Sequence, residues 1–321
     1  MKRAATILLI FSLTICNALG QVINLKKNWR FRIGDELAWA ATDYDDSRWD
    51  MIRVPSHWED DGFNGYDGFA WYRTKFDGTL LNPNEMYSLN LGFIDDCDEV
   101  YLNGRAIAFS GQFPPKFKTA YNNERKYSLP NDIINFKGQN TIAVRVFDAF
   151  QGGGIFDGKI GIFPLGGDKK LLIDLQGIWH FARTRSEGQT PDEDDWDNIM
   201  VPSPWEHQGF SRYDGFARYR KTFSLPANFT QEEVVLMLGK IDDFDKVYLN
   251  GKLIGVTNDH EPYGSSESYQ LDRVYKIPKD LLKRGGSNTI EVIVEDMGNI
   301  GGIYEGRVGI TTRANYERYF R

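Results

Sequence analysis

The sequence predicts an all-β protein made of two tandem jelly-roll β-sandwiches, and three observations support this prediction. The segment 54–76 returns as 201–223 with 15 of 23 positions identical, at an offset of 147. Apolar residues within each copy alternate with a period of two, as in half-buried strands. Gly, Pro and Asn separate these short runs, and a chain of 321 residues is long enough for two cores of common size.

The first 20 residues have the pattern of a secretory signal peptide. Lys2 and Arg3 precede an apolar run from 4 to about 15, and Gly20 stands at the expected cleavage site. The run is too short for a permanent membrane span, and no later stretch approaches the length of one. We therefore expect an exported protein, periplasmic or extracellular, with no integral membrane segment after cleavage.

Charge and cysteine content narrow the possible functions further. Cleavage would leave 36 basic against 45 acidic residues, which argues against a nucleic-acid partner. The mature chain would keep only Cys97, so no internal disulfide is possible. Phe244 stands at the aligned position of the second copy, which favours a buried structural thiol at Cys97.

The repeat sets the expected boundaries: a sandwich over 21–165, a linker over 166–170, a sandwich over 171–315 and a tail over 316–321. The segment 91–104 returns as 238–251 with 11 of 14 positions identical. A strand is expected over 141–147, and Asn103-Gly104 and Asn250-Gly251 are hairpin-turn signals. Only 130–136 and 278–284 look like a helical turn.

The repeated motifs are VPSxWExxGFxxYDGFAxYRxxF, LGxIDDxDxVYLNG and GGIxxG, in that order in each copy. Together they resemble the galactose-binding-like β-sandwich that accompanies sialate O-acetylesterase-type enzymes. They are also similar, more distantly, to the N-terminal sugar-binding domain of family 2 glycoside hydrolases. The resemblance covers nearly the whole mature chain. It implies a module that packs beside a catalytic domain and sometimes contacts carbohydrate, while the two sandwiches leave no room here for the catalytic domains of those families.

No residue is predicted to be catalytic. None of the four histidines has a histidine at the aligned position of the other copy, and no Gly-x-Ser-x-Gly motif occurs. Glycoside hydrolysis needs two carboxyls across the sugar. Acidic residues are abundant near strand ends, among them Asp95, Asp96 and Asp148 and the aligned residues of the second copy, Asp242, Asp243 and Asp296. Most of these are interpreted as structural, because carboxylates hold loops by accepting backbone N–H bonds and pairing with arginines.

Carbohydrate recognition combines a flat aromatic ring with planar polar groups, and each copy offers this mixture. Trp71 becomes Arg218 in the second copy, so Trp71 is expected to be an exposed, copy-specific contact. The predicted carbohydrate-binding residues are Trp58, Tyr66, Asp67, Trp71, Arg73 and Phe156 in the first copy, and Trp205, Tyr213, Asp214, Arg218, Arg220 and Tyr304 in the second.

No cofactor is required, although calcium is possible in either of two acidic loops, at Asp43, Asp45 and Asp46 or at Asp192, Asp194 and Asp195. The favoured function is a non-catalytic protein of glycan breakdown that binds carbohydrate or docks a glycan-degrading enzyme. Duplication would suit avidity for a polymer. Two alternatives stay open: a glycosidase or carbohydrate acetylesterase whose site uses acids such as Asp96 or Asp243, and a purely structural module.

Overall fold

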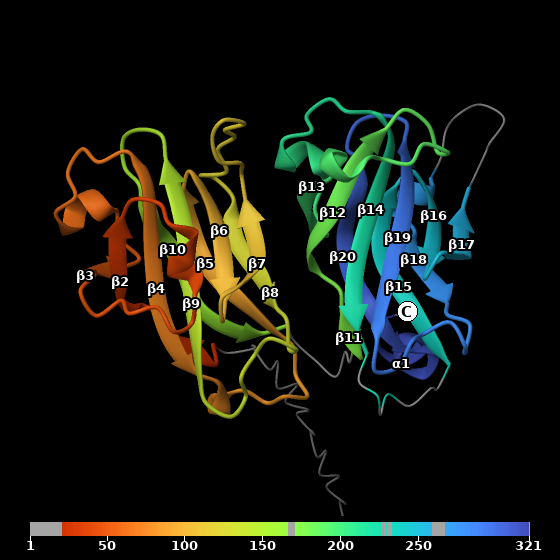
Figure 1. The fold of residues 1–321 in the computed structure, drawn as a ribbon, viewed down its shortest axis with the longest axis horizontal. Coiled ribbons are helices and arrows are strands. Elements are labelled where there is room, and N and C mark those ends of the chain that lie inside the picture. The colour runs from red at the N-terminus through yellow and green to blue at the C-terminus, as the bar shows by residue number, and fades with distance from the viewer. Residues whose placement is uncertain are drawn as a thin grey trace, which may run out of the picture.

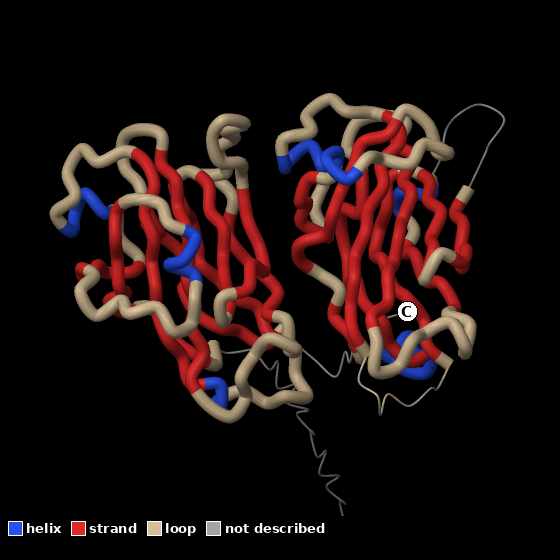
Figure 2. The backbone as a smooth tube through the Cα atoms, viewed as in Figure 1, coloured by secondary structure: helices blue, strands red, loops and turns tan. Residues whose placement is uncertain are grey.

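The computed structural model describes residues 21–165, 171–225, 227, 229, 233–258 and 267–320. The predicted signal peptide (1–20) and linker (166–170) lie outside the described residues. The described chain forms two β-sandwich domains that stand side by side (Figure 1). Strands dominate both domains (Figure 2), so the predicted all-β sandwich class is confirmed.

The first sandwich contains a four-stranded sheet of order β1-β10-β5-β8 and a six-stranded sheet of order β3-β2-β4-β9-β6-β7. Each pairing between these strands is antiparallel. The strands are β1 (Ile23–Asn24), β2 (Lys27–Ile33), β3 (Asp50–Val54), β4 (Gly68–Asp77), β5 (Tyr87–Asp95), β6 (Cys97–Leu102), β7 (Arg105–Ser110), β8 (Glu124–Leu129), β9 (Gln139–Asp148) and β10 (Gly154–Pro164).

The second sandwich repeats this topology, with sheets of order β11-β20-β15-β18 and β13-β12-β14-β19-β16-β17. Its strands are β11 (Ile173–Asp174), β12 (Gly177–Thr184), β13 (Asp197–Val201), β14 (Gly215–Ser224), β15 (Val234–Asp242), β16 (Phe244–Leu249), β17 (Lys252–Thr257), β18 (Asp272–Lys276), β19 (Ser287–Asp296) and β20 (Gly302–Thr312). The sequence repeat therefore encodes the same strand order twice.

Short helical segments lie between the strands or follow the last one. They are the 3₁₀ turns η1 (Leu37–Ala40), η2 (Trp58–Asp61), η3 (Gly78–Leu80), η4 (Glu193–Asp195), η5 (Trp205–Gln208) and η6 (Ser268–Gln270), followed by the α-helix α1 (Arg313–Tyr319). The sequence did not predict α1, which begins with Thr312 accepting a hydrogen bond from the Asn315 backbone. The expected helical turns at 130–136 and 278–284 are single hydrogen-bonded turns. Among the described residues, no helix has the length and apolar character needed to cross a membrane.

The alternation read from the sequence explains the strands. Ile142, Val144 and Val146 in β9 are fully buried between the sheets, as period-two spacing requires. The predicted Asn103-Gly104 turn joins β6 to β7, and both residues have positive φ, which suits Asn and Gly. The equivalent turn joins β16 to β17.

A buried ion pair links the two sheets of each sandwich. The Arg125 Nε atom donates to Asp98 Oδ1 at 2.7 Å, with both side chains excluded from solvent. Its other nitrogens donate to four backbone carbonyls near the ends of the surrounding strands. Arg273 and Asp245 repeat the arrangement at 2.7 Å. The predicted pairing of acids with arginines is thus confirmed at these positions.

The two domains contact each other along β7 and β12. The Gln112 amide donates to the Gln208 carbonyl at 2.7 Å, and the Ser128 hydroxyl donates to Asp174 Oδ2 at 2.7 Å. The Arg307 guanidinium donates to the Leu165 carbonyl at 3.0 Å. These bonds hold the sandwiches together at several points along the seam.

Candidate functional site

The predicted aromatic platform is inside the protein. Trp58 and Trp205 are fully buried, and their indole N–H groups donate to the carbonyls of Tyr66 and Tyr213 at 3.2 and 3.1 Å. Each indole lies beneath a glycine-rich turn, since a Cβ on Gly153 would meet the Trp58 ring at 2.1 Å. These two tryptophans are core residues and cannot stack on a sugar.

The expectation that Trp71 is exposed is wrong. Its side chain is fully buried, stacked on Tyr101 with ring centroids 5.5 Å apart and edge-on to Trp39 at 6.2 Å. The indole N–H donates to Asp35 Oδ1 at 3.2 Å. The chain between β2 and β3, which contains Trp39, covers Trp71 and forms a small second core outside the sandwich. In the other copy, Arg218 instead pairs with Glu291 and donates to two backbone carbonyls.

The other predicted contacts are mostly engaged in holding loops. Arg73 is buried and its Nε donates to Asp46 at 2.8 Å, so it is unavailable to a ligand. The Tyr66 and Tyr213 hydroxyls donate to backbone carbonyls, and the Tyr304 hydroxyl donates to the Tyr269 carbonyl. Phe156 stacks on His57 at 4.8 Å. Asp67 and Asp214 are exposed, and Arg220 is half-buried beside the second domain's contact with the first.

The acidic loops have protein partners of their own. Asp45 accepts a hydrogen bond from the Ser47 backbone at 3.0 Å, and Asp46 pairs with Arg73. Asp195 accepts from the backbone of Asp192 at 3.1 Å in a capping box. Neither these residues nor Asp43 and Asp194 belong to a group of acids close enough to share an ion in the described part of the chain. Calcium binding at these loops stays a prediction.

Another set of acids does converge, once in each sandwich. Asp95 ends β5, Asp96 follows it, and Asp148 ends β9 in the opposite sheet. A carboxylate oxygen from each lies within 4.8 Å of one from the other two. Asp242, Asp243 and Asp296 form the same group in the second domain. We call these groups the acidic triads.

The triads are largely shielded from water, which alters their ionisation. Burial, followed by the charge of Asp96, raises the pKa of Asp95 to about 7. Burial, then the bond to and charge of Asp243, raises the pKa of Asp242 to about 8. Burial likewise raises the pKa of Asp148 to about 6. Three carboxylates so close together cannot all stay charged without a compensating cation or proton.

Cys97 behaves as the sequence suggested. The thiol is free and buried, and burial raises its pKa well above the usual range. A nucleophilic cysteine requires a lowered pKa and access to solvent. Cys97 is therefore a structural residue.

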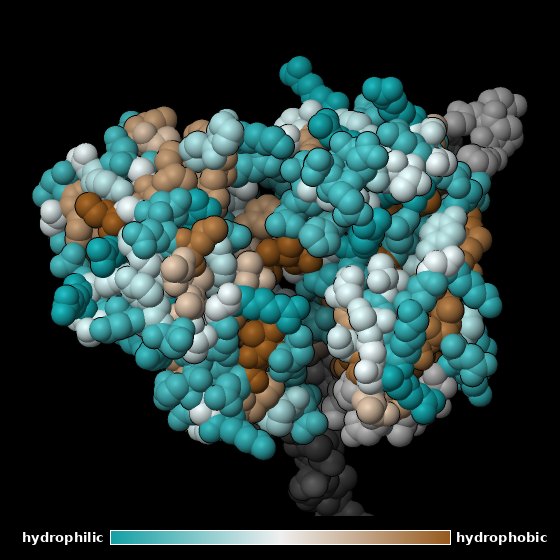
Figure 3. Space-filling view, in the orientation of Figure 1, coloured by the Kyte–Doolittle hydropathy of each residue, from teal (hydrophilic) through white to brown (hydrophobic). Residues whose placement is uncertain are grey.

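A large cleft lies between the two sandwiches, and we call it the seam cleft. Its volume is about 650 Å³, and it is lined by the start of β7, the chain after β8, and parts of β11, β12 and β14. Figure 3 shows the surface hollowed between the domains, with hydrophobic residues gathered there. Pockets of this size at domain interfaces are usual ligand sites.

Charged side chains line the seam cleft. Lys221 donates to the Ile178 carbonyl at 2.6 Å, and burial lowers its pKa to about 8. The Arg220 guanidinium lies 4.1 Å from the centre of the Trp196 ring, and Arg105 pairs with Asp132 at 3.3 Å. Apart from Arg220, the sequence reasoning did not point to these residues, because the cleft exists only where the two copies meet.

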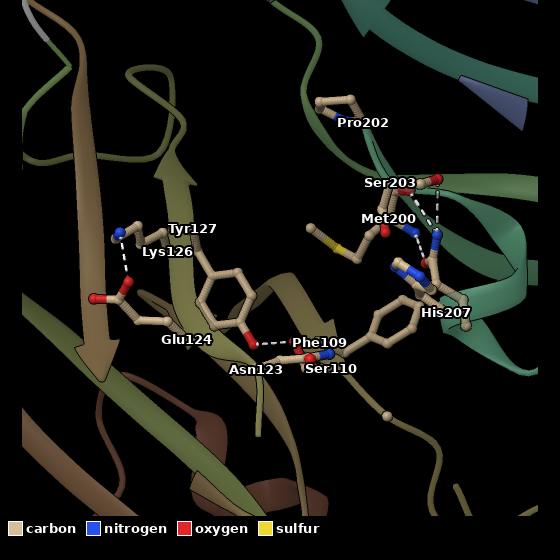
Figure 4. A pocket seen from close by; sticks show the side chains of 12 residues that line it. Phe109, Ser110, Asn123, Glu124, Lys126, Tyr127, Met200, Pro202, Ser203 and His207 are labelled. Carbon is tan, nitrogen blue, oxygen red and sulfur yellow. Dashed lines mark hydrogen bonds and ion pairs between the residues drawn. The ribbon is translucent and has the colours of Figure 1, made fainter. Parts of the chain in front are cut away.

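A second, smaller cleft of about 190 Å³ lies on the same seam. Figure 4 shows Phe109 of the first domain pointing toward Met200 and His207 of the second. Beside it, the hydroxyls of Ser110 and Tyr127 are hydrogen-bonded at 2.7 Å. Its volume is too small for more than a single small ligand group.

Fold and surface together define a tandem β-sandwich protein with a cleft at its domain interface. A family model described as "Beta-galactosidase second all-beta domain" matches residues 34–149 and 178–300. Because these stretches make up more than half of the chain, the protein belongs to this family.

The chain is also similar to parts of several named proteins. A protein described as "Putative beta-glucuronidase" from Formosa agariphila is 28% identical over 142 residues, which are 40% of this chain and 13% of that protein. The crystal structure of a Bacteroides uniformis β-glucuronidase is similar at 16% identity with a TM-score of 0.38, over 88% of this chain and 28% of the other. The crystal structure of a β-glycosidase from Bacteroides vulgatus is similar at 18% identity with a TM-score of 0.34, over 85% of this chain and 29% of the other.

The chain thus spans only a small part of the length of the relatives it matches. Both the family and the curated relative belong to the context of glycan breakdown. This supports the expected likeness to glycoside hydrolase accessory domains. The likeness to domains of sialate O-acetylesterase-type enzymes stays a prediction.

Proposed function

We propose that this chain is an exported, non-catalytic accessory protein of glycan breakdown that binds a saccharide in the seam cleft. The seam cleft itself carries the proposal. Its volume of about 650 Å³ suits a short oligosaccharide, and both domains contribute to its walls. Leu172, Ile173 and Ile178 supply apolar surface for the C–H face of a pyranose, while polar groups stand around it.

The lining favours a saccharide that carries a carboxylate. Arg105, Arg220 and Lys221 outnumber the acids Asp132 and Asp174 in a chain whose net charge is −7. The Asp174 carboxylate already accepts bonds from Ser128 and Gln176. The ammonium of Lys221 donates to the Ile178 carbonyl, and the side chain is partly buried, so an anion in the cleft would stabilise its charge.

The curated relative lends support to the same substrate class. Its name refers to a glucuronide, a sugar with a carboxylate at C6, and it matches 40% of this chain. A uronate is therefore the first saccharide to test. We propose binding of this saccharide without hydrolysis, because the acids of the sandwiches are not arranged as those of a glycosidase.

Hydrolysis by the acidic triads is disfavoured by geometry. Asp96 and Asp243 are each 8% exposed, and Asp148 and Asp296 are more deeply buried. A glycosidase places two carboxyls on opposite sides of a sugar ring, about 5 to 10 Å apart. The triad oxygens lie within 4.8 Å of one another, so no pyranose fits between them.

A second candidate function, docking of a glycan-degrading enzyme, rests on length. The homologous region takes up 13% of the curated relative, so most of that protein lies outside the region that this chain matches. Co-migration of this chain with a separate glycosidase on size-exclusion chromatography would support docking, and separate elution would argue against it.

Saccharide binding is tested by isothermal titration of the chain from residue 21 with neutral and uronate-containing oligosaccharides. We expect heat with the uronates, and at least a tenfold loss of affinity in Lys221→Met and Arg220→Ala. Arg53→Ala is the matched control, because Arg53 is exposed and pairs with Asp61 away from the cleft. No heat with any saccharide, or equal binding by all variants, would overturn the proposal.

A further inference from the structure

The acidic triads have a property that the rest of the structure does not explain. Each joins the two opposed sheets at one end of a sandwich, through acids at the ends of β5 and β9 or of β15 and β19. The same three residue positions converge in both copies, although 147 to 148 residues separate the equivalents. Convergence alone is weak evidence, since acidic groups often occur without a ligand.

The second observation concerns the innermost acid of each triad. Asp148 is fully buried and Asp296 is 2% exposed. Their Oδ1 atoms accept backbone N–H bonds from Phe150 and Gly298 at 3.3 and 3.0 Å. Their Oδ2 atoms are excluded from solvent and accept no hydrogen bond. A buried carboxylate oxygen without a donor is costly unless a cation or proton satisfies it.

The nearby guanidinium does not satisfy these oxygens. Arg125 directs its donors to Asp98 and to backbone carbonyls, one of which belongs to Asp96. Arg273 does the same with Asp245. In the second domain the Oε1 atom of Glu206, whose charge acts on Asp296, is also buried without a partner. In the part of the chain that the structure describes, no cationic side chain forms an ion pair with a triad carboxylate, although the charges of Arg125 and Arg273 act on Asp95 and Asp242.

We propose that each acidic triad binds one Ca²⁺ ion between the two sheets of its sandwich. Oxygen ligands are the preferred donors of Ca²⁺, at 2.3 to 2.6 Å, so two ligands of one ion lie at most about 5 Å apart. The triad oxygens lie within 4.8 Å of one another, which meets this condition. Mg²⁺ holds its ligands at 2.0 to 2.1 Å and needs a tighter octahedron. Carboxylates disfavour softer metals.

Such an ion would tie the sheets together where regular pairing ends. Asp96 already accepts from the Ala149 backbone at 3.0 Å, and Asp243 from Met297 at 3.0 Å. Each of these bonds fixes one acid of its triad, and the bonds from Phe150 to Asp148 and from Gly298 to Asp296 fix a second one before the ion arrives. The site is thus preorganised, and each ion adds a link between β5 and β9 or between β15 and β19.

The test is calcium titration of the chain from residue 21, after treatment with chelator, followed by calorimetry and by terbium luminescence. We expect two ions per chain and a higher unfolding temperature with Ca²⁺ than with chelator. Asp148→Asn and Asp296→Asn should each remove one ion, and the double variant both. Asp50→Asn and Asp280→Asn, exposed acids outside the triads and outside the two acidic loops, are matched controls that should keep both ions.

Several outcomes would overturn the proposal. They are absence of calcium uptake by the wild type at millimolar concentration, tighter binding of Mg²⁺ than of Ca²⁺, and loss of ions in the control variants instead of the triad variants. The wild-type titration decides even where a triad variant fails to fold. Circular dichroism in chelator shows whether Asp148→Asn keeps the fold, and the half-buried Asp95→Asn provides a second variant of the same site.

Discussion

Substituting Arg125 by Met should destabilise the first sandwich strongly and leave the second unaffected. The substitution removes five hydrogen bonds and leaves the Asp98 carboxylate without its counterion at a position with 0% side-chain exposure. Breaking a buried pair in this way costs about 3 to 5 kcal/mol. For a domain of this size, 1 kcal/mol moves the unfolding temperature by about 2 to 4 °C. We therefore expect a decrease of about 6 to 20 °C.

Differential scanning calorimetry measures this directly, as a transition for the first sandwich separated from the transition of the second. Arg105→Met is the matched control, because Arg105 and Asp132 are 64% and 68% exposed and such pairs contribute at most about 1 kcal/mol. Adding Asp98→Asn to Arg125→Met should recover part of the loss by removing the uncompensated charge. A shift for Arg125→Met no larger than that of Arg105→Met would refute the reasoning.

Three further predictions concern other parts of the structure. The pKa of Lys221 is lowered from 10.5 to about 8, so the unfolded state binds more protons between pH 8 and pH 10.5. The free energy of unfolding of the wild type, measured by chemical denaturation, should therefore rise by about 3 kcal/mol relative to that of Lys221→Met over this pH range. A difference between the two proteins that does not change with pH would contradict this prediction. Gly153→Ala and Gly301→Ala should lower the free energy of unfolding by at least about 1 to 3 kcal/mol in the same assay, because each Cβ would lie within 2.2 Å of a tryptophan ring. Gly188→Ala is the control and should be neutral, because the space around Gly188 is open. Equal effects of the three substitutions would count against the packing described. Trp71→Ala should lower the free energy of unfolding of the first sandwich by about 3 to 5 kcal/mol, while the folded protein binds saccharide as the wild type does. A variant of normal stability with weakened saccharide binding would indicate instead that Trp71 is an exposed contact.

The fold followed from local pattern. Period-two alternation in 141–147 identified a core strand, and Asn103-Gly104 identified a hairpin, because both signals depend on neighbours in the sequence. The repeat then gave the architecture twice. The helix α1 was missed because its seven residues carry no apolar stripe long enough to be recognised.

The candidate sites were predicted less well from the sequence than the fold was. Trp71 differs from its counterpart Arg218, and difference between copies suggested exposure. The structure shows instead that the chain before β3 covers Trp71 with Trp39 and Trp49, a contact between residues over 20 positions apart. Exposure of a side chain depends on what packs over it, and sequence spacing within one strand does not contain that information.

The sequence by itself determined the strand content, the duplication, and the expectation that acidic residues near strand ends pair with arginines. Only the tertiary structure decided which acids meet and where a cleft forms. Asp95 and Asp148 come together because β5 and β9 belong to facing sheets, and the seam cleft arises because β7 of one copy packs beside β12 of the other. Side-chain periodicity is a local property of the backbone, whereas convergence of distant residues is set by how sheets and domains pack.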